Sequence, residues 1–290
     1  MLEGVVPFPR EFARRYREKG YWQDKSLAEE FKAVFENYAD RTAIIDEEIR
    51  LTYRQLDELS TNLALNLLDL GFEPLDRVVP QLPTIKEFPI LYFALQKIGC
   101  IPIAALSTHR YAEISQFVEL SGAVACVTPD RHREFSFTDM ITRIRGESTT
   151  LKYGIVLGEA PDGFVSLTEL IGRPATRKQT ELESLQIDPT DPAVFQLSGG
   201  TTGIPKLIPR THNDYAYNSR TATEVTEVDG DSCLLLVLPI AHNLPLACPG
   251  MQGFMLRGGR IVLSISARAE DVFRLVQEHR VTHIHLVPAI

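Results

Sequence analysis

The sequence has few cysteines and no long hydrophobic run, and both absences exclude classes of protein. Its four cysteines, at positions 100, 126, 233 and 248, lie too far apart for a CxxC metal or redox motif. We therefore expect free thiols in a reducing cytoplasm. The longest apolar runs, such as residues 233–241, are too short to cross a bilayer, and the N-terminus has no apolar segment typical of a secretory signal. A cytoplasmic protein without a membrane partner is predicted.

Basic residues do not outnumber acidic residues in this sequence. Thirty Lys and Arg against 38 Asp and Glu give a formal net charge of −8. Such a chain has no general attraction to nucleic acid or to an anionic membrane, so any phosphate must be bound by a local site. With 44% hydrophobic residues and a mean hydropathy of −0.06, the 290 residues indicate one large globular domain or two ordinary ones.

What the sequence does contain is an alternation of helical and strand-like segments. Thr52 and Gln55 form a capping-box pair before a helix that Gly71 ends. One face of this helix carries Leu56, Leu59, Leu63, Leu67 and Leu70. Strand-like stretches then occur at residues 76–82, 100–106, 123–129, 152–158, 193–197, 206–209, 233–241, 260–264 and 282–288. The alternation predicts an α/β fold with mostly parallel sheets.

A second helix is predicted from Thr84 to Gly99, with Glu87 as the capping-box partner of Thr84. Pro89 disagrees with this start, because proline in a helix removes a hydrogen bond and crowds the preceding turn. The helix therefore either begins late or kinks at Pro89.

The most informative stretch is LSGGTTGIPK, residues 197–206. Phosphate oxygens need several converging N–H donors, and glycine lets the backbone approach them and adopt positive φ. The stretch supplies glycines, hydroxyl groups and one cation: Gly199, Gly200 and Gly203, then Ser198, Thr201 and Thr202, then Lys206. This composition is typical of a triphosphate-binding loop, and the alternative is a flexible hairpin turn.

Two other phosphate or hydrolase motifs are excluded. A Walker A loop needs Gly directly before the Lys and Ser or Thr directly after it, whereas Pro205 precedes Lys206 and Leu207 follows. A nucleophile elbow would need glycine where Gln196 stands, so Ser198 is a poor candidate for a hydrolase nucleophile.

The order [ST]-G-G-[ST]-[ST]-G-x-P-K resembles the phosphate loop of the adenylate-forming enzymes. The resemblance implies two stacked α/β units of the N-terminal domain of such an enzyme. In that division residues 1–50 are an arm packing on the core, residues 51–185 a first subdomain, and residues 186–290 an incomplete second subdomain with the phosphate loop. The resemblance also implies ATP and Mg²⁺ as cofactors, with the loop and Lys206 binding the β- and γ-phosphates and the acidic Mg²⁺ ligand beyond Ile290.

The flanking sequence resembles one branch, the salicylate and 2,3-dihydroxybenzoate AMP ligases of siderophore biosynthesis. The stretches that carry this likeness are PFPREFARRYREKGYWQ, QLSGGTTGIPKLIPRTHNDYAYN and LPIAHNLPLACPG. The branch implies adenylation of an aryl acid and transfer to the phosphopantetheine thiol of an aryl carrier protein. His242 would then lie beside the reacting carboxylate and assist catalysis with Lys206, and Asn243 would bind the neighbouring ring hydroxyl.

Cys248 is predicted to line the aryl pocket. The matching residue in this branch is commonly serine in enzymes for 2,3-dihydroxybenzoate and cysteine in enzymes for salicylate, so salicylate is favoured. Plainer alternatives remain for these positions. His242 and Asn243 can satisfy a turn, and Cys248 can be a buried small residue without effect on specificity.

The resemblance also implies what this chain lacks. The family's adenine and ribose motifs and the catalytic lysine of its C-terminal domain match nothing up to Ile290. We therefore expect the 290-residue chain alone to be inactive. Two further alternatives remain open, a CoA ligase for benzoate-like acids and a non-catalytic nucleotide-binding remnant. His279, His283 and His285 lie close in sequence but have no acidic or cysteine partner nearby, so no metal site is predicted.

Overall fold

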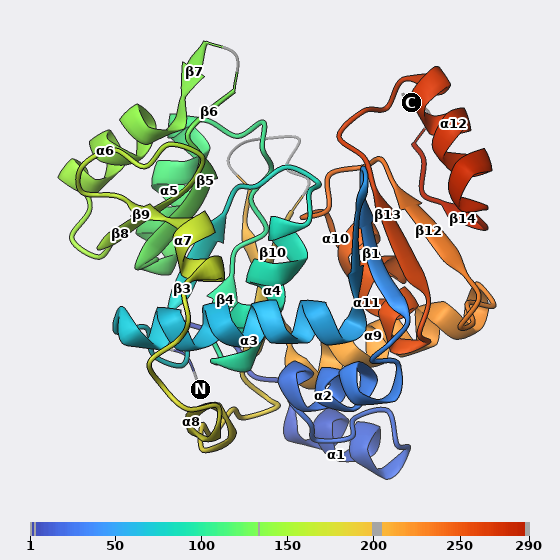
Figure 1. The fold of residues 1–290 in the computed structure, drawn as a ribbon. Coiled ribbons are helices and arrows are strands. Elements are labelled where there is room, and N and C mark those ends of the chain that lie inside the picture. The colour runs from blue at the N-terminus through green and yellow to red at the C-terminus, as the bar shows by residue number, and fades with distance from the viewer. Residues whose placement is uncertain (1, 3, 133, 199–204, 288–290) are drawn as a thin grey trace.

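Two five-stranded sheets organise the described part of the chain, with helices covering their faces (Figure 1). This computed structural model describes residues 2, 4–132, 134–198 and 205–287. In the first sheet the strand order is β4-β3-β5-β8-β9, and every neighbouring pair is parallel. Its strands are β3 (Arg77–Pro80), β4 (Ile101–Pro102), β5 (Ala125–Pro129), β8 (Tyr153–Leu157) and β9 (Val165–Ser166). The predicted α/β class with mostly parallel sheets is confirmed.

The second sheet has the order β14-β12-β13-β1-β2, and only the β1–β2 pair is antiparallel. Its strands are β1 (Thr42–Asp46), β2 (Ile49–Thr52), β12 (Cys233–Leu236), β13 (Arg260–Leu263) and β14 (His283–Ile284). The sequence analysis had assigned no strand to residues 42–52. The pairing of β1 with β13 joins segments more than 200 residues apart, and no local pattern predicts such a partner.

A hairpin of β10 (Pro192–Leu197) and β11 (Leu207–Thr211) lies between the two sheets (Figure 1). Its first strand meets the first sheet through a parallel bridge of Phe195 with Ile103, and the Ala104 N–H donates to the Phe195 carbonyl at 2.9 Å. A smaller hairpin consists of β6 (Arg131–His132) and β7 (Phe135–Ser136). The central hairpin therefore holds the ends of the candidate phosphate loop beside the first sheet.

The described residues form helices between and around these strands. They are α1 (Arg10–Glu18), α2 (Leu27–Asn37), α3 (Tyr53–Asp69), α4 (Glu87–Lys97), α5 (Tyr111–Ser121), α6 (Phe137–Glu147), α7 (Leu167–Gly172), α8 (Thr180–Glu183), α9 (His212–Val225), α10 (Asn243–Ala247), α11 (Gly250–Leu256) and α12 (Ala269–His279). None of these helices combines the length and the apolar character that crossing a membrane would require.

Helix α3 confirms its predicted start. The Gln55 N–H donates to the Thr52 hydroxyl at 3.2 Å, and the Thr52 N–H donates to the Gln55 side chain at 2.9 Å. The leucine face enters the largest hydrophobic core, with Leu56, Leu63 and Leu67 fully buried. That core contains residues of both sheets, and so it packs the two sheets into one structure.

The predicted capping box of Thr84 with Glu87 is wrong, whereas the late start suggested by Pro89 is confirmed. Helix α4 begins at Glu87, which places Pro89 in the first turn, where a missing N–H costs no helical bond. The Thr84 hydroxyl instead donates to the Leu238 carbonyl and accepts from the Ile240 N–H, at 3.3 and 3.2 Å. Thr84 therefore links this helix entry to the segment that follows β12.

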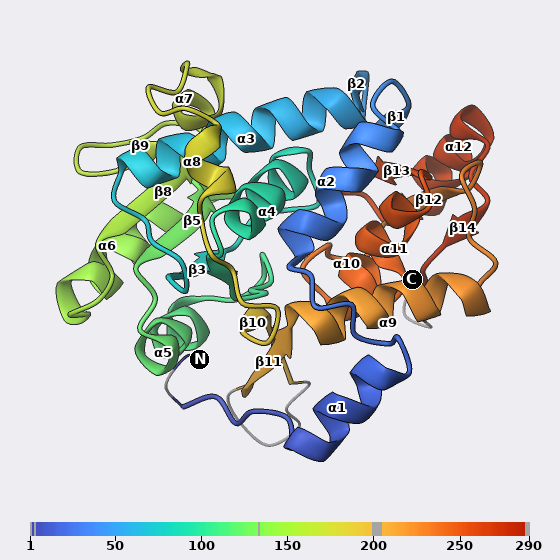
Figure 2. The same ribbon diagram turned by 90° about the horizontal axis from the view of Figure 1, so that it is seen from below.

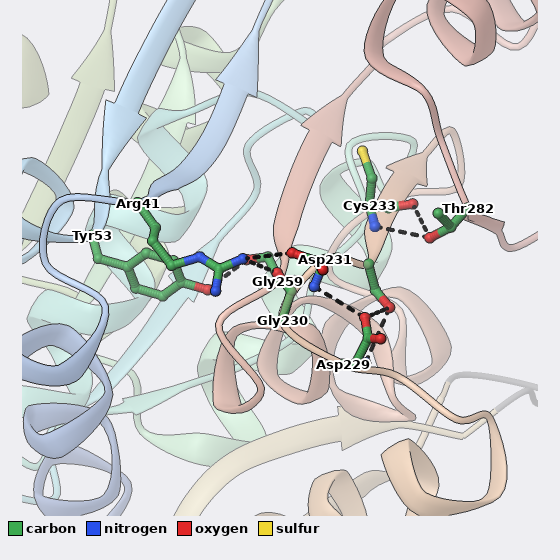
Figure 3. Close-up of polar contacts among 9 residues, drawn as sticks. Arg41, Tyr53, Asp229, Gly230, Asp231, Cys233, Gly259 and Thr282 are labelled. Carbon is green, nitrogen blue, oxygen red and sulfur yellow. Dashed lines mark hydrogen bonds and ion pairs between the residues drawn. The ribbon is translucent and has the colours of Figure 1, made fainter.

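Polar contacts fix the ends of the second-sheet strands (Figure 3). The Tyr53 hydroxyl donates to the Gly259 carbonyl at 2.5 Å, and the Arg41 guanidinium donates to the Gly230 carbonyl. The Cys233 N–H donates to the Thr282 hydroxyl at 2.9 Å, which attaches the start of β14 to β12. These bonds satisfy backbone groups that the short strands leave unpaired.

The N-terminal segment is held on α9, which runs between α1 on one side and α10 and α11 on the other (Figure 2). The Asn213 amide exchanges two hydrogen bonds with Asp24, each 2.9 Å long. Arg220 forms an ion pair with Glu30 at 2.7 Å, and Tyr21 stacks on Tyr217 with ring centroids 4.7 Å apart. The described N-terminal residues therefore pack on the helix that also borders the candidate site.

The buried imidazole of His212 makes this attachment sensitive to acid. Its Nδ1 accepts a hydrogen bond from the Leu27 N–H at 3.1 Å, which requires a neutral ring. Burial lowers the pKa of His212 from 6.5 to about 4, against a weaker opposing effect of Asp188. Above pH 6.5 the ring is neutral in both states, whereas between pH 6.5 and 4 only the unfolded chain gains the proton. Stability is therefore lost as pH falls through this window.

We expect acidification from pH 7 to 4.5 to lower the free energy of unfolding through His212 by roughly 2–3 kcal/mol. Urea denaturation at both pH values measures the loss. In a His212→Asn variant the amide oxygen still accepts from Leu27 but cannot titrate, so the acid-dependent loss should shrink by this amount. Equal losses in the two proteins would contradict the assignment.

Candidate functional site

The two described ends of the glycine-rich loop close a hairpin. The Ser198 N–H donates to the Lys206 carbonyl at 3.0 Å, and the Lys206 N–H donates to the Ser198 hydroxyl oxygen at 2.9 Å. The Lys206 side chain is exposed and forms no ion pair with a described residue. Of the predicted phosphate-binding residues, Gly199, Gly200, Thr201, Thr202 and Gly203 lie outside the described residues.

The hairpin changes the role expected of Ser198. The β10–β11 ladder continues one residue past the Leu197–Leu207 pair, so the Ser198 amide is used within the hairpin and cannot join a phosphate nest. Among the described residues its hydroxyl acts only as an acceptor, toward the Lys206 N–H, and donates to none of them. The Lys206 ammonium remains an available cation at the rim of the loop.

A buried tyrosine connects this hairpin to the predicted aryl-binding residues. Gln196, two residues before Ser198 on β10, donates from its side-chain amide to the Tyr215 hydroxyl at 3.0 Å. The Tyr215 hydroxyl in turn donates to the Asn243 side-chain oxygen at 3.2 Å. Tyr215 is fully buried, and Asn243 is half-buried at the start of α10. The structure thus brings Asn243 into one hydrogen-bonded chain with the strand that leads into the loop.

His242 precedes α10 as its N-cap, without a side-chain capping bond. Its ring is exposed and makes no hydrogen bond with a described residue. His109, between β4 and α5, is its electrostatic neighbour. Burial lowers the pKa of His109, the nearby His242 lowers it further, and Glu113 acts in the opposite direction.

The segment that carries His109 is held firmly. The Gln81 side chain donates to the carbonyls of Leu106 and His109 at 3.0 and 2.7 Å, and the Leu106 N–H donates to His109 Nδ1 at 3.0 Å. A neutral imidazole that accepts at Nδ1 carries its proton on Nε2. The segment between β4 and α5 thus brings a second imidazole, that of His109, near His242.

Cys248 follows the other end of α10 and is half-buried. Its sulfur lies 3.9 Å from the Asn218 side-chain oxygen. Asn218 and Ser219, both on α9, donate to the Ala247 carbonyl at 3.0 and 2.8 Å and so complete the C-terminal end of α10. Asn243 and Cys248 are therefore held at opposite ends of one short helix by side chains of α9.

The positively charged side chain of Arg210 lies against this cluster. Its guanidinium carbon lies 5.0 Å from the centre of the Tyr215 ring, and its Nε forms an ion pair with Asp214 at 2.5 Å. Burial raises the pKa of Tyr215, so the phenol keeps its proton. Tyr215 can therefore act as a donor throughout the physiological pH range.

Four residues of this cluster escaped the sequence analysis: Tyr215, His109 and Asn218 were not singled out, and Gln196 served only to exclude a nucleophile elbow. Gln196 carried a weak signal, because residues two apart on a strand share a face and Gln196 precedes Ser198 by two. Tyr215 and His109 carried none, since their partners come from distant segments.

Other features of the described residues stand apart from this cluster. A cavity of about 580 Å³ between α2, α3 and residues 179–187 contains none of the predicted site residues. Lys97 at its edge is already bonded to Asp57, Ser60 and Thr61. No group of three or more His, Cys, Asp or Glu that could hold a metal ion occurs in the described ranges.

Comparisons with known proteins identify the family of the chain. The family model described as AMP-binding enzyme matches residues 31–290. The chain is 40% identical over 290 residues to the 2,3-dihydroxybenzoate-AMP ligase of Bacillus subtilis, covering 100% of this chain and 52% of that protein. It is 37% identical over 294 residues to the salicyl-AMP ligase / salicyl-S-ArCP synthetase of Mycobacterium tuberculosis, covering 100% of this chain and 51% of the relative.

Among solved structures, the apo structure of MbtA from Mycobacterium smegmatis matches with a TM-score of 0.91 and 38% identity. The match covers 99% of this chain and 52% of that one. The chain therefore spans about half the length of the relatives that it matches. Since the family model covers most of the sequence and the predicted fold agrees, the chain belongs to the AMP-binding enzymes, with aryl acid-AMP ligases among its relatives.

Proposed function

We propose that this chain supplies the phosphate loop and the aryl-acid site of an ATP-dependent ligase of siderophore biosynthesis. The complete enzyme would adenylate an aryl acid, with salicylate preferred over 2,3-dihydroxybenzoate, and pass it to the phosphopantetheine thiol of an aryl carrier protein. The observation that carries the proposal is the hydrogen-bonded chain from Gln196 through Tyr215 to Asn243. It connects the strand entering the loop with the residue expected to bind the ring hydroxyl.

The chemistry explains why a cation is needed at the loop. A carboxylate is a weak nucleophile that the charged phosphates of ATP repel, so the enzyme must neutralise charge and align the reacting atoms. In this proposal the exposed Lys206 ammonium and the free Ser198 hydroxyl proton bind the β- and γ-phosphates. Mg²⁺ would supply further neutralisation, but the described residues offer no acidic cluster for it, and we assign no metal ligand.

The two residues at the start of α10 would bind the acid. His242 is exposed and its ring is free of described partners, so it can approach the substrate carboxylate. Asn243 follows directly and can reach the ring position next to that carboxylate. His242 would thus contact the carboxylate and Asn243 the 2-hydroxyl group of a 2-hydroxylated benzoic acid. Salicylate and 2,3-dihydroxybenzoate share these two adjacent substituents.

Cys248 would discriminate between these two acids. A thiol is a weak hydrogen-bond partner that suits an unsubstituted ring edge, whereas a serine hydroxyl can pair with a 3-hydroxyl group. We expect Cys248→Ser to raise kcat/KM for 2,3-dihydroxybenzoate relative to salicylate by about 10-fold, the effect of one added hydrogen bond. Aryl-acid-dependent ATP–pyrophosphate exchange by the full-length protein measures this ratio.

Cys248→Ala is the matched control, because it removes the thiol without adding a hydroxyl. It should not shift the ratio toward 2,3-dihydroxybenzoate. An unchanged preference in the serine variant would contradict a role for Cys248 in specificity. Wild-type preference for 2,3-dihydroxybenzoate would overturn the salicylate assignment.

The proposal as a whole is tested by exchange and loading assays of the full-length protein. We expect exchange with salicylate and loading of a purified aryl carrier protein in preference to free CoA. Transfer to CoA alone would identify a CoA ligase of the same family. Absence of exchange with every aryl acid, together with ATP binding, would identify a nucleotide-binding protein without this activity.

A further inference from the structure

The Gln196–Tyr215–Asn243 chain has a defined direction. A phenol has a single proton, and the Gln196 amide nitrogen, 3.0 Å away, donates to the phenol oxygen. The proton of Tyr215 is therefore free for its second partner, the Asn243 side-chain oxygen at 3.2 Å. The Tyr215 hydroxyl thus accepts one hydrogen bond and donates another.

The opposite orientation of the Asn243 amide leaves a buried group unsatisfied. With Gln196 donating as it does in the structure, an Asn243 nitrogen facing Tyr215 would make both amides donors to the phenol oxygen, and the phenol proton would have no acceptor. An unsatisfied buried hydroxyl is unfavourable, and Tyr215 is fully buried. Burial also raises the pKa of Tyr215, so the proton is not lost to relieve the conflict.

The orientation determines what Asn243 presents on its other side. With its oxygen bonded to Tyr215, the amide nitrogen is the group left over, and it donates to none of the described residues. Asn243 is only half-buried, so this nitrogen is not sealed inside the core. Asn243 thus offers its N–H donors to a neighbouring ligand, while its oxygen is turned toward Tyr215.

We propose that Tyr215 is a positioning residue that locks the Asn243 amide as a hydrogen-bond donor, so that the site selects aryl acids with an acceptor at the ortho position. This inference rests on the proposed function, which makes Asn243 the residue that meets the ortho substituent. Gln196 contributes because its side-chain N–H donates to the Tyr215 oxygen, which leaves the phenol proton for Asn243.

Salicylate and 2-aminobenzoate differ only in the ortho group, and so they distinguish a locked Asn243 amide from one that rotates freely. In salicylate the ortho hydroxyl donates its proton to the adjacent carboxylate, which leaves the oxygen lone pairs for the Asn243 donor. In 2-aminobenzoate the nitrogen lone pair is delocalised into the ring, and the remaining N–H would point at the N–H groups of Asn243. A locked donor therefore favours salicylate, whereas an amide that rotates freely can serve both acids.

The test is Tyr215→Phe in the full-length protein, which removes only the hydroxyl oxygen and its proton. Pyrophosphate exchange is measured with salicylate, 2-aminobenzoate and benzoate, and kcat/KM is compared as ratios within each protein, so the amount of folded enzyme cancels. We expect the salicylate to 2-aminobenzoate ratio to fall by about 10-fold and the 2-aminobenzoate to benzoate ratio to rise.

Tyr53→Phe is the matched control. It also removes a hydroxyl from a fully buried tyrosine, but that hydroxyl donates to the carbonyl of Gly259, the residue before β13, and not to Asn243 (Figure 3). Its three ratios should equal those of the wild type.

The outcomes are distinct. Unchanged ratios in Tyr215→Phe would overturn the locking role, and so would an equal loss with all three acids, which indicates a merely structural tyrosine. Failure of the wild type to activate any of the three acids would instead refute the proposed function, on which the orientation argument depends.

Discussion

Replacing Lys206 with alanine is expected to lower aryl-acid-dependent pyrophosphate exchange by roughly 100- to 1,000-fold in the full-length protein. The side chain is exposed at the end of the phosphate hairpin, and no described acidic residue pairs with it, so its full charge is available to the nucleotide. In the proposed mechanism the charge acts on the transition state of adenylation, so kcat/KM for ATP should fall while the folded structure persists. Thermal unfolding measured alongside exchange separates the two effects.

Two variants control this experiment. Lys152→Ala removes an equally exposed lysine from the first unit, at the start of the strand-like stretch that contains β8, and should leave exchange unchanged. Lys206→Arg keeps the charge and should retain more activity than alanine, although the wider guanidinium changes the geometry. Full exchange by Lys206→Ala would remove the loop from the proposed mechanism.

Gly250→Ala is the substitution with the largest expected cost to stability near the site. An added Cβ would lie 2.3 Å from the Pro245 carbonyl oxygen, which is backbone and cannot turn aside. The φ angle of 45° is also in the left-handed region, which L-residues adopt at a cost. We expect a loss of about 2–5 kcal/mol in the free energy of unfolding, from strain and overpacking together.

The clash would also displace α10, because Pro245 lies in the middle of that helix. Asn243 and Cys248 would move with it, so kcat/KM for salicylate should fall in the fraction of protein that remains folded. Gly146→Ala is the matched control, since a Cβ there meets nothing within 4 Å and Gly146 lies in α6. If Gly250→Ala unfolds no earlier in urea than Gly146→Ala, the close approach of α10 to α11 is not rigid.

The elements that the sequence predicted well are those whose signals are local. The Thr52–Gln55 capping box and the leucine face of α3 act within one helix, and both are found in the structure. The Thr84 capping box failed because the Thr84 hydroxyl bonds to the backbone after β12, about 155 residues away. Strand β1 was missed for the same reason, since its parallel partner β13 lies in the other half of the chain.

The candidate site divides in a similar way. The order of small residues, proline and lysine at positions 198–206 could be read directly from the sequence, whereas the roles of His242 and Asn243 were inferred from the family resemblance and stay predictions. The hydrogen-bonded partners of Asn243 could not, because Tyr215 looks like an ordinary core residue of a helix until its hydroxyl is seen between Gln196 and Asn243. The hydrogen bond of the Ser198 amide to the Lys206 carbonyl, which closes the hairpin, was not predicted from the sequence either.

Helix α9 serves two neighbours at once. One set of its side chains, His212, Asn213 and Arg220, holds the N-terminal residues, and another, Tyr215, Asn218 and Ser219, holds both ends of α10. Deleting N-terminal residues is therefore expected to affect the proposed acid-binding residues as well. A deletion that removed Asp24 and Glu30 would remove contacts from one side of α9, whose other side holds the proposed acid-binding residues at the ends of α10. Redesign of substrate range should leave these opening residues in place.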